Sequence, residues 1–502
     1  MATWDGRGRP AEGFTEERAA EELEAAGYRL AGVEEPDIAS DVEPNDVGYD
    51  LAIIGGGSAA FAAAIKASEL GGRVAMIERG TIGGTCVNIG CVPSKALLRA
   101  ADHYHRAGHS PFAGVETATG RVDLSSLVAQ KDRLVDTMRQ EKYEDLVGVY
   151  GFDVIRGEAR FIGPDRLEVD GRSLRADRFL IATGANPWAP PIEGLHDAGY
   201  LISTTALDLT EVPEELMVVG ANAIGLELGQ LFLHLGSRVT FVEALDRIAP
   251  FEEPEISELL SAHLESLGAE IITSASITKA GRAGDRRFIE AHIGETSRRI
   301  EADEILVATG RRARTEDLGL DAAGVEVDRR GHVIVDDRMV TSNPKVLAAG
   351  DVTTVPQFVY VAGLTGSIAA ENALRPPRRR LDLTTMPRIT FTTPPIGSVG
   401  LTETEAREAG HQVITSVLPL EAVPRALVDH DTTGLVKLVA DETTGRLLGA
   451  HILAEGAGDV IQAAVMAIKY QATVDEIADT FHPYLTMAEA LKLTAQGFRK
   501  DV

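Results

Sequence analysis

The sequence predicts an α/β protein with two Rossmann-like dinucleotide-binding folds followed by a C-terminal α+β domain. Two glycine-rich turns, near residues 55 and 220, each follow an apolar strand and precede a helical pattern, which indicates two copies of one unit. After Met386 the chain becomes rich in short strands, and helical patterns follow at 457–470 and from about 486. At 502 residues the chain is long enough for about three domains.

The composition argues against several classes of function. A net charge of −27 disfavours binding to nucleic acid or to anionic membranes. No stretch approaches the roughly 20 apolar residues that span a bilayer, and the N-terminus lacks the pattern of a signal peptide, so a cytoplasmic location is expected. The only two cysteines are Cys86 and Cys91. In a reducing compartment such a close pair favours a catalytic or metal-binding role over a structural disulfide.

The first glycine-rich turn, at residues 55–60, follows the strand-like run 50–54 and opens a helix of small residues. Glycines allow a tight turn and a close approach of the backbone to a pyrophosphate, and the helix start supplies N–H groups. The next strand ends at a carboxylate that can accept hydrogen bonds from a ribose hydroxyl. The predicted contacts of this unit are Gly55, Gly57, Ala60 and Glu78.

The second glycine-rich turn, at residues 217–225, has Asn222 where the first has a glycine. Asparagine tolerates a left-handed backbone better than most residues, so it is a suitable replacement for a glycine in such a turn. The following strand ends at Glu243, which would bond a free 2′-hydroxyl and repel a 2′-phosphate, although Arg247 lies nearby. This favours NADH over NADPH. The predicted contacts of this unit are Gly220, Asn222, Gly225, Glu243 and Gly310.

The two cysteines lie in the segment 83–95, at the start of a predicted helix. Helix-start N–H groups and the nearby Lys95 lower the pKa of a thiol and favour the reactive thiolate. A zinc site is disfavoured because four-ligand sites need more Cys or His residues close by. The segment therefore predicts a redox-active pair.

With this segment and the two nucleotide units, residues 49–502 resemble the pyridine nucleotide–disulfide oxidoreductases. The resemblance implies a homodimer whose subunits carry FAD, NAD(P) and interface domains. It implies that Cys91 faces the flavin, that Cys86 meets the substrate, and that Lys95 pairs with Glu227 beside the flavin. Further FAD contacts are expected at Thr85, Lys95, Thr183, Gly184 and Asp351.

The expected domain boundaries follow from the two units and the resemblance. The N-terminal segment is acidic, and part of it weakly resembles the end of a metal-binding domain. The expected domains are an N-terminal extension at 1–48, an FAD-binding domain at 49–200 and 321–384, an NAD(P)-binding domain at 201–320, and a dimerisation domain at 385–502.

Two C-terminal segments, 423–427 and 481–493, look like those of the mercuric reductases within this family. Lipoamide and glutathione reductases have a His five residues before the residue that aligns with Glu489, whereas this chain has Tyr484. Disulfide exchange needs a base that titrates near pH 7, which an ordinary phenol does not supply. Hg(II) is a soft cation that suits a thiolate pair. The resemblance therefore implies reduction of Hg(II)–thiol complexes, with the metal held by Cys86, Cys91 and the partner's Tyr484.

Several alternatives remain open at this stage. His482 is the base if the alignment contains a gap, and the chain is then similar to dihydrolipoamide dehydrogenase. A third hypothesis is that the chain is a flavoprotein that only sequesters metal through its thiols. Thr486 and Glu489 also fit a helix capping box. Mercuric reductases usually end in a tail with adjacent cysteines, whereas this sequence ends at Val502. If Val502 is the true end, direct delivery of Hg(II) to Cys86 from small thiol complexes is expected.

Overall fold

The protein is described by a computed structural model over residues 48–376 and 378–499. Residues 1–47 of the expected N-terminal extension, residue 377 and the chain end at 500–502 lie outside the described residues. Within the described ranges, none of the helices combines the length and the apolar character needed to cross a lipid bilayer.

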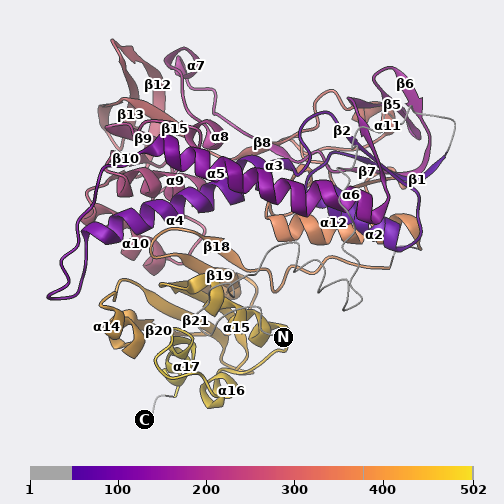
Figure 1. Ribbon diagram of the computed structural model, residues 1–502. Coiled ribbons are helices and arrows are strands. Elements are labelled where there is room, and N and C mark those ends of the chain that lie inside the picture. Colours follow the sequence, from indigo (N-terminus) through magenta and orange to yellow (C-terminus); the bar gives the residue numbers. More distant parts are fainter. Residues whose placement is uncertain (1–47, 377, 500–502) are drawn as a thin grey trace, which may run out of the picture. The chain divides into compact units, whose positions relative to one another are not determined.

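The first nucleotide unit is built on a five-stranded parallel sheet with the strand order β17-β7-β1-β2-β3. The central strand β1 is almost fully buried, as its apolar sequence predicts for a sheet covered on both faces. Helices α2 and α12 lie side by side against this sheet (Figure 1). The elements are β1 (Tyr49–Ile54), α2 (Ser58–Glu69), β2 (Val74–Glu78), β3 (Asp153–Arg156), β7 (Ala176–Ile181), β17 (Val346–Ala348) and α12 (Val359–Leu374).

The second nucleotide unit repeats this design on a parallel sheet with the order β11-β10-β9-β15. An antiparallel sheet, β12-β13-β14, adjoins it. The elements are β9 (Glu215–Val219), α9 (Ala223–His234), β10 (Arg238–Val242), α10 (Pro254–Ser266), β11 (Glu270–Ile272), β12 (Ala275–Ala283), β13 (Arg286–Ile293), β14 (Thr296–Ala302) and β15 (Glu304–Val307).

The C-terminal domain is an antiparallel sheet of order β18-β19-β22-β21-β20 packed with helices. The sequence predicts two helices after the strands, whereas the structure has three, because a short capped turn forms the additional helix α16. The elements are β18 (Arg388–Thr390), β19 (Ile396–Gly400), α13 (Glu403–Glu408), β20 (Val413–Pro419), α14 (Pro424–Asp429), β21 (Leu435–Asp441), β22 (Leu447–Leu453), α15 (Ala457–Lys469), α16 (Val474–Asp479) and α17 (Glu489–Gln496).

Two long helices, α4 and α5, connect the nucleotide units (Figure 1). Leu97 and Ala101 of α4 belong to the same apolar core as Leu228 and Phe232 of α9. The helix that follows the cysteines is therefore packed on the second nucleotide unit. The connecting elements are α3 (Gly84–Ile89), α4 (Cys91–Gly108), α5 (Leu124–Arg139), a π-helix (Gln140–Glu144) and α6 (Asp145–Tyr150).

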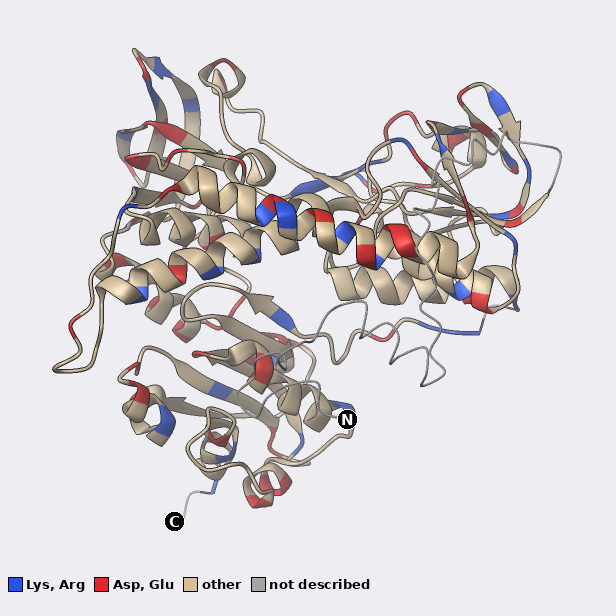
Figure 2. Cartoon of the chain, in the orientation of Figure 1, with Lys and Arg blue, Asp and Glu red and all other residues tan. Residues whose placement is uncertain are grey.

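Smaller elements complete the described chain. A three-stranded antiparallel sheet comprises β4, β5 and β6, and β8 pairs with β16. Acidic and basic residues are spread over many elements (Figure 2). These elements are β4 (Ala159–Gly163), β5 (Arg166–Val169), β6 (Arg172–Leu174), β8 (Ala185–Pro187), α7 (Leu195–Ala198), α8 (Ser203–Ala206), β16 (Arg311–Ala313) and α11 (Leu320–Ala323).

Candidate active site

The first glycine-rich turn forms a cradle at the start of helix α2. Gly55 has φ +115°, and a Cβ there would lie 2.4 Å from the carbonyl oxygen of Ala182. A Cβ on Gly84 would lie 2.6 Å from the Cα of Gly57, so two glycines meet where the cradle touches α3. Gly57 is the N-cap of α2 and no side chain caps the helix start, which leaves its N–H groups to bind an anion. The cradle fits a pyrophosphate.

A cavity of about 490 Å³ extends from this cradle to the cysteines and to the C-terminal domain. It brings together most of the residues that the sequence predicts for the first unit and for the redox pair. Predicted residues that line it are Gly55, Gly57, Glu78, Thr85, Cys86, Cys91, Lys95, Thr183, Gly184, Glu227 and Asp351. Ala60 is fully buried within α2, beneath the cradle.

The carboxylate of Glu78 lies at the end of strand β2, next to the cradle. One oxygen accepts a hydrogen bond from Gly80 N at 2.6 Å, and the other lies 2.9 Å from the position of a Cβ on Gly56. The backbone at Gly56 can therefore approach the carboxylate only because it has no side chain. Thr183, across the cavity, donates its hydroxyl to Arg314 O at 2.6 Å, so its side chain fixes the turn.

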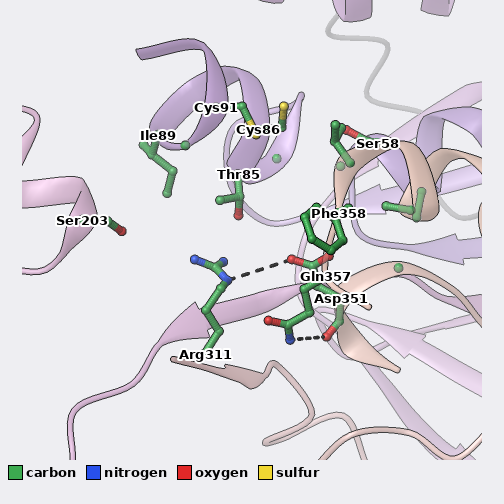
Figure 3. A pocket seen from close by; sticks show the side chains of 18 of the residues that line it. Ser58, Thr85, Cys86, Ile89, Cys91, Ser203, Arg311, Asp351, Gln357 and Phe358 are labelled. Atoms are coloured by element: carbon green, nitrogen blue, oxygen red, sulfur yellow. Dashed lines mark hydrogen bonds and ion pairs between the residues drawn. The ribbon is translucent and has the colours of Figure 1, made fainter. Parts of the chain in front are cut away.

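Asp351 lies deeper in the cavity, close to Arg311 (Figure 3). The Arg311 Nε lies 3.9 Å from Asp351 Oδ2, and Gln357 donates to the Asp351 carbonyl at 3.2 Å. Burial raises the pKa of Asp351, and Arg311 opposes that shift. A partly buried carboxylate that lines a cavity can accept hydrogen bonds from hydroxyl groups of a ligand.

The two cysteines lie on different helices, although the sequence predicts both at the start of one helix. Cys86 lies within α3, whereas Cys91 is the first residue of α4. Gly90 separates them with φ −130° and ψ −105°, which lie outside the helical region and end α3. Both sulfur atoms are unbonded thiols that face the cavity (Figure 3).

The two thiols differ in pKa. A hydrogen bond from Cys86 lowers the pKa of Cys91 to about 7, burial opposes that shift, and the charge of Lys95 assists it. The same hydrogen bond, together with burial, raises the pKa of Cys86. Because the two thiols titrate as a pair, the thiolate near neutral pH resides on Cys91 while Cys86 keeps its proton.

Lys95 and Glu227 form an ion pair beside the thiols. Lys95 Nζ lies 2.6 Å from Glu227 Oε2, and the carboxylate is 8% exposed. The other carboxylate oxygen accepts Phe391 N at 2.9 Å. The pair therefore joins α4, α9 and the C-terminal domain at one wall of the cavity.

The second glycine-rich turn is as tightly packed as the first. Gly220 has φ +97°, and a Cβ on Gly225 would lie 1.8 Å from the Gly220 carbonyl oxygen. Asn222 does not use its tolerance of left-handed dihedrals, because its φ of −106° and ψ of −170° are extended. Asn222 is the N-cap of α9, and a residue at that position takes extended dihedrals. Gly310 has φ +117° at the opposite turn.

Glu243 directly follows strand β10 and is 7% exposed. Its two carboxylate oxygens accept Ala221 N at 2.7 Å and Leu245 N at 2.9 Å. Arg247 donates to Pro250 O at 2.9 Å and is thereby directed toward main-chain carbonyls. A negative charge is therefore fixed at the strand end where the sequence predicts ribose binding.

Within one subunit, Tyr484 is not among the described residues that line the thiol cavity. It is 71% exposed, and His482 lines a separate cavity of about 290 Å³ within the C-terminal domain.

The alternative capping box is wrong, because α17 begins at Glu489 and Thr486 instead donates its hydroxyl to Pro483 O. The described residues contain no group of three or more His, Cys, Asp or Glu arranged to hold a metal. The thiol pair thus offers two sulfur ligands.

Sequence reasoning did not identify three further residues of this region. Phe391 and Arg311 line the cavity, and Tyr143 shares a hydrogen bond with Ser58 at 3.1 Å. Tyr143 lies in the π-helix, an element that is frequent at functional sites. Arg311 directly follows the predicted turn at Gly310, and this position is the sequence feature that could have indicated it. The other two come from distant segments without a motif.

Comparison with known proteins gives consistent matches over almost the whole chain. Residues 49–366 match the sequence model of the pyridine nucleotide–disulphide oxidoreductases, and residues 386–495 match that of their dimerisation domain. The mercuric reductase of Staphylococcus aureus is 50% identical over 97% of this chain and 89% of its own length. That of Streptomyces lividans is 50% identical over 91% of this chain and 97% of its own length.

Solved structures agree with these matches. The Cu(II) complex of the HOCl-induced flavoprotein disulfide reductase RclA from Escherichia coli has a TM-score of 0.80 and 30% identity, covering 90% of this chain and 99% of that one. LpdA from Mycobacterium tuberculosis has a TM-score of 0.79 and 26% identity, covering 89% of this chain and 98% of that one.

Proposed function

The chain belongs to the pyridine nucleotide–disulphide oxidoreductase family, and we propose that within it the chain is a mercuric reductase. Membership confirms the predicted fold class and the predicted cofactors FAD and NAD(P)H. The proposed reaction converts Hg(II) and NAD(P)H to Hg(0), NAD(P)⁺ and a proton. The observation that carries the proposal is the pair of unbonded thiols, Cys86 and Cys91, in the cavity that begins at the nucleotide cradle.

The thiol pair suits Hg(II) as substrate. Hg(II) is soft, and thiolates are the softest ligands that side chains provide. Cys91 is the thiolate near neutral pH, so one of the two sulfur ligands is already deprotonated. Coordination at Cys86 then requires loss of its proton, which the bound cation favours. With both sulfurs bound, the metal is held beside the cofactor cavity.

The residues of the cradle and cavity fit FAD. The start of α2 is open to a pyrophosphate, Glu78 stands where a ribose would bind, and the partly buried Asp351 can accept hydrogen bonds from ribityl hydroxyls. When bound, FAD accepts two electrons from NAD(P)H and passes them on. We infer FAD contacts at Gly55, Gly57, Glu78, Thr85, Lys95, Thr183, Gly184 and Asp351, and NAD(P) contacts at Gly220, Asn222, Gly225, Glu243 and Gly310. The expected contact at Ala60 is not retained, because this residue is fully buried and does not line the cavity.

We also propose a homodimer in which Tyr484 of the partner subunit approaches the thiols. The match of residues 386–495 to a dimerisation domain supports the association of two subunits. The segment that carries Tyr484 exposes large side chains, with Phe481 99% exposed. Exposed aromatic clusters are typical of surfaces that another chain covers. The partner's Tyr484 would then supply a phenol beside the thiolate-bound metal.

The deciding experiment is NAD(P)H oxidation by the full-length holoenzyme with Hg(II)–thiol complexes, lipoamide or glutathione disulfide as acceptors. We expect oxidation with Hg(II) and release of Hg(0) vapour, and little or none with either disulfide. Cys86→Ala should abolish the Hg(II)-dependent activity. Vigorous lipoamide reduction without Hg(0) release would assign a dihydrolipoamide dehydrogenase-like enzyme instead. A protein that binds Hg(II) tightly and whose flavin is bleached by NADH, but that does not turn Hg(II) over, would be a metal-sequestering flavoprotein.

A further inference from the structure

One buried side chain outside the cavity, Gln230, holds a main-chain segment that forms part of the cavity wall. Gln230 lies on α9 and is 1% exposed. Its Nε2 donates to Thr393 O at 2.6 Å, and its Oε1 accepts Thr393 N at 2.7 Å. The amide thus satisfies both polar groups of one residue, as a neighbouring strand would.

Glu227, one turn earlier on the same helix, holds the same segment. Residues three apart on a helix share a face, so Glu227 and Gln230 both point at residues 391–393. Glu227 Oε1 accepts Phe391 N at 2.9 Å, while its Oε2 binds Lys95. Alternate residues of the extended segment are therefore fixed by side chains of α9, beyond the end of strand β18 at Thr390.

The anchored segment places an aromatic ring on the ion pair. Lys95 Nζ lies 4.6 Å from the centroid of the Phe391 ring, within the range of a cation–π contact. The ring lines the cavity and is 45% exposed, so its own packing does not fix it. Its position depends on the main chain at 391–393, and therefore on the two side chains of α9.

We propose that Gln230 is a positioning residue for the Lys95–Glu227 ion pair, acting through the Phe391 ring that it holds against the ammonium. The ring occupies one side of the Lys95 ammonium, and charges interact more strongly where a side chain takes the place of water. Lys95 lines the cofactor cavity, so its field acts on the flavin and on the Cys91 thiolate. The inference rests on FAD as cofactor and does not depend on Hg(II) as substrate.

The test measures the flavin in the absence of Hg(II). Gln230→Leu keeps the bulk and removes both hydrogen bonds, while Phe391→Leu keeps the segment and removes the ring. In each variant we expect NAD(P)H to reduce the flavin about fivefold more slowly, the flavin midpoint potential to fall, and the thiolate–flavin charge-transfer band to weaken. Because both variants disrupt the same contact between Lys95 and the Phe391 ring, flavin reduction in the double variant should be no slower than in the slower single variant.

Asn372 provides a matched control. Its side-chain amide is buried on α12, with the residue 6% exposed, and forms hydrogen bonds with the main chain of residues 338 and 378–379. None of these residues lines the cavity. Asn372→Leu should lower the melting temperature as Gln230→Leu does, but leave the reduction rate, potential and charge-transfer band unchanged. Equal flavin behaviour of Gln230→Leu and Asn372→Leu, or additive effects of Gln230→Leu and Phe391→Leu, would overturn the proposal. Since Hg(II) is absent, loss of the mercury assignment alone would leave these results unaffected.

Discussion

Lys437 Nζ lies 3.0 Å from Glu253 Oε2, and both side chains are 2% exposed. The ammonium also contacts Glu255 at 2.8 Å and Glu403 at 3.0 Å. Burial would lower the pKa of Lys437, but the hydrogen bonds to these carboxylates raise it. Glu253 and Glu255 lie at the start of α10, whereas Lys437 lies on β21, so the cluster ties the second nucleotide unit to the C-terminal domain.

Lys437→Met should destabilise the protein strongly, because it leaves Glu253 buried without its cation. Removing one partner of a buried pair costs about 3–5 kcal/mol. Urea denaturation followed by circular dichroism measures the change in the free energy of unfolding. Lys345→Met is the control, because Lys345 pairs with Asp165 at 2.9 Å with both side chains nearly half exposed, and should cost about 1 kcal/mol or less. Equal, small losses for the two variants would contradict this prediction.

His234 should make the protein less stable in mild acid. Its ring stacks on His105 with centroids 4.3 Å apart, and burial, with the charge of His105, lowers the pKa of His234 to about 3. The unfolded chain therefore binds a proton near pH 6.5 that the folded protein does not bind. The stabilisation is fully present above about pH 6.5 and decreases as the pH falls toward 3, by up to about 2 kcal/mol at pH 5.

His234→Phe keeps an aromatic ring and removes the titrating group. Melting temperatures at pH 7 and pH 5 should then differ less than in the unmodified protein. His196→Phe is a suitable control, because the side chain of His196 is 95% exposed and meets solvent in both states. An unchanged difference between pH 7 and pH 5 in His234→Phe would show that other groups cause the acid sensitivity.

Local patterns predicted the parts of the site that lie next to each other in the sequence. The turns at Gly55 and Gly220 have positive φ, and the strands that follow end at Glu78 and directly before Glu243, because turn chemistry and strand periodicity are local. The contact of Lys95 with Glu227 joins residues far apart in the chain, and only the family resemblance indicated it.

The remaining details depend on contacts that no local pattern encodes. The break between α3 and α4 arises at Gly90, where a glycine inside a helical pattern can either be tolerated or end the helix. Asn222 is extended because α9 begins there, which outweighs its intrinsic tolerance of left-handed dihedrals. The hydrogen bonds of Gln230 to Thr393 form only once the second unit and the C-terminal domain meet.

The buried Glu243 leads us to predict that NADH is at least as good an electron donor as NADPH. A 2′-phosphate would approach a carboxylate that Ala221 N and Leu245 N hold in place, and Arg247 is directed toward carbonyl oxygens. Steady-state kinetics of Hg(II)-dependent oxidation with both donors provides the measurement. A preference for NADPH of about tenfold in kcat/KM, or about 1.4 kcal/mol, would refute the role of Glu243 while leaving the family assignment intact.

The thiols should give distinct optical signatures after two-electron reduction. Cys91→Ala should abolish the thiolate–flavin charge-transfer band, whereas Cys86→Ala should retain a band and lose Hg(II) turnover. Because the pKa of Cys91 is about 7, the band in the unmodified enzyme should grow as the pH rises through that value. In Cys86→Ala the hydrogen bond that lowers this pKa is gone, so the midpoint should move to higher pH. A midpoint that stays the same would contradict the assigned coupling.

Tyr484→Phe removes only the hydroxyl and decides between the two reductase classes. We expect it to lower Hg(II) turnover and to leave flavin reduction by NAD(P)H unchanged, because the phenol would act on the thiol-bound metal from the partner subunit and not on the nicotinamide. Stopped-flow bleaching of the flavin and steady-state Hg(II) turnover separate the two steps.

Tyr484→His should gain weak disulfide reductase activity, since imidazole titrates near neutral pH. His482→Gln is the control, because His482 lines the separate cavity and should not affect Hg(II) turnover. Lipoamide reduction by the unmodified enzyme that is lost in His482→Gln and retained in Tyr484→Phe would make His482 the base and withdraw the mercuric reductase assignment.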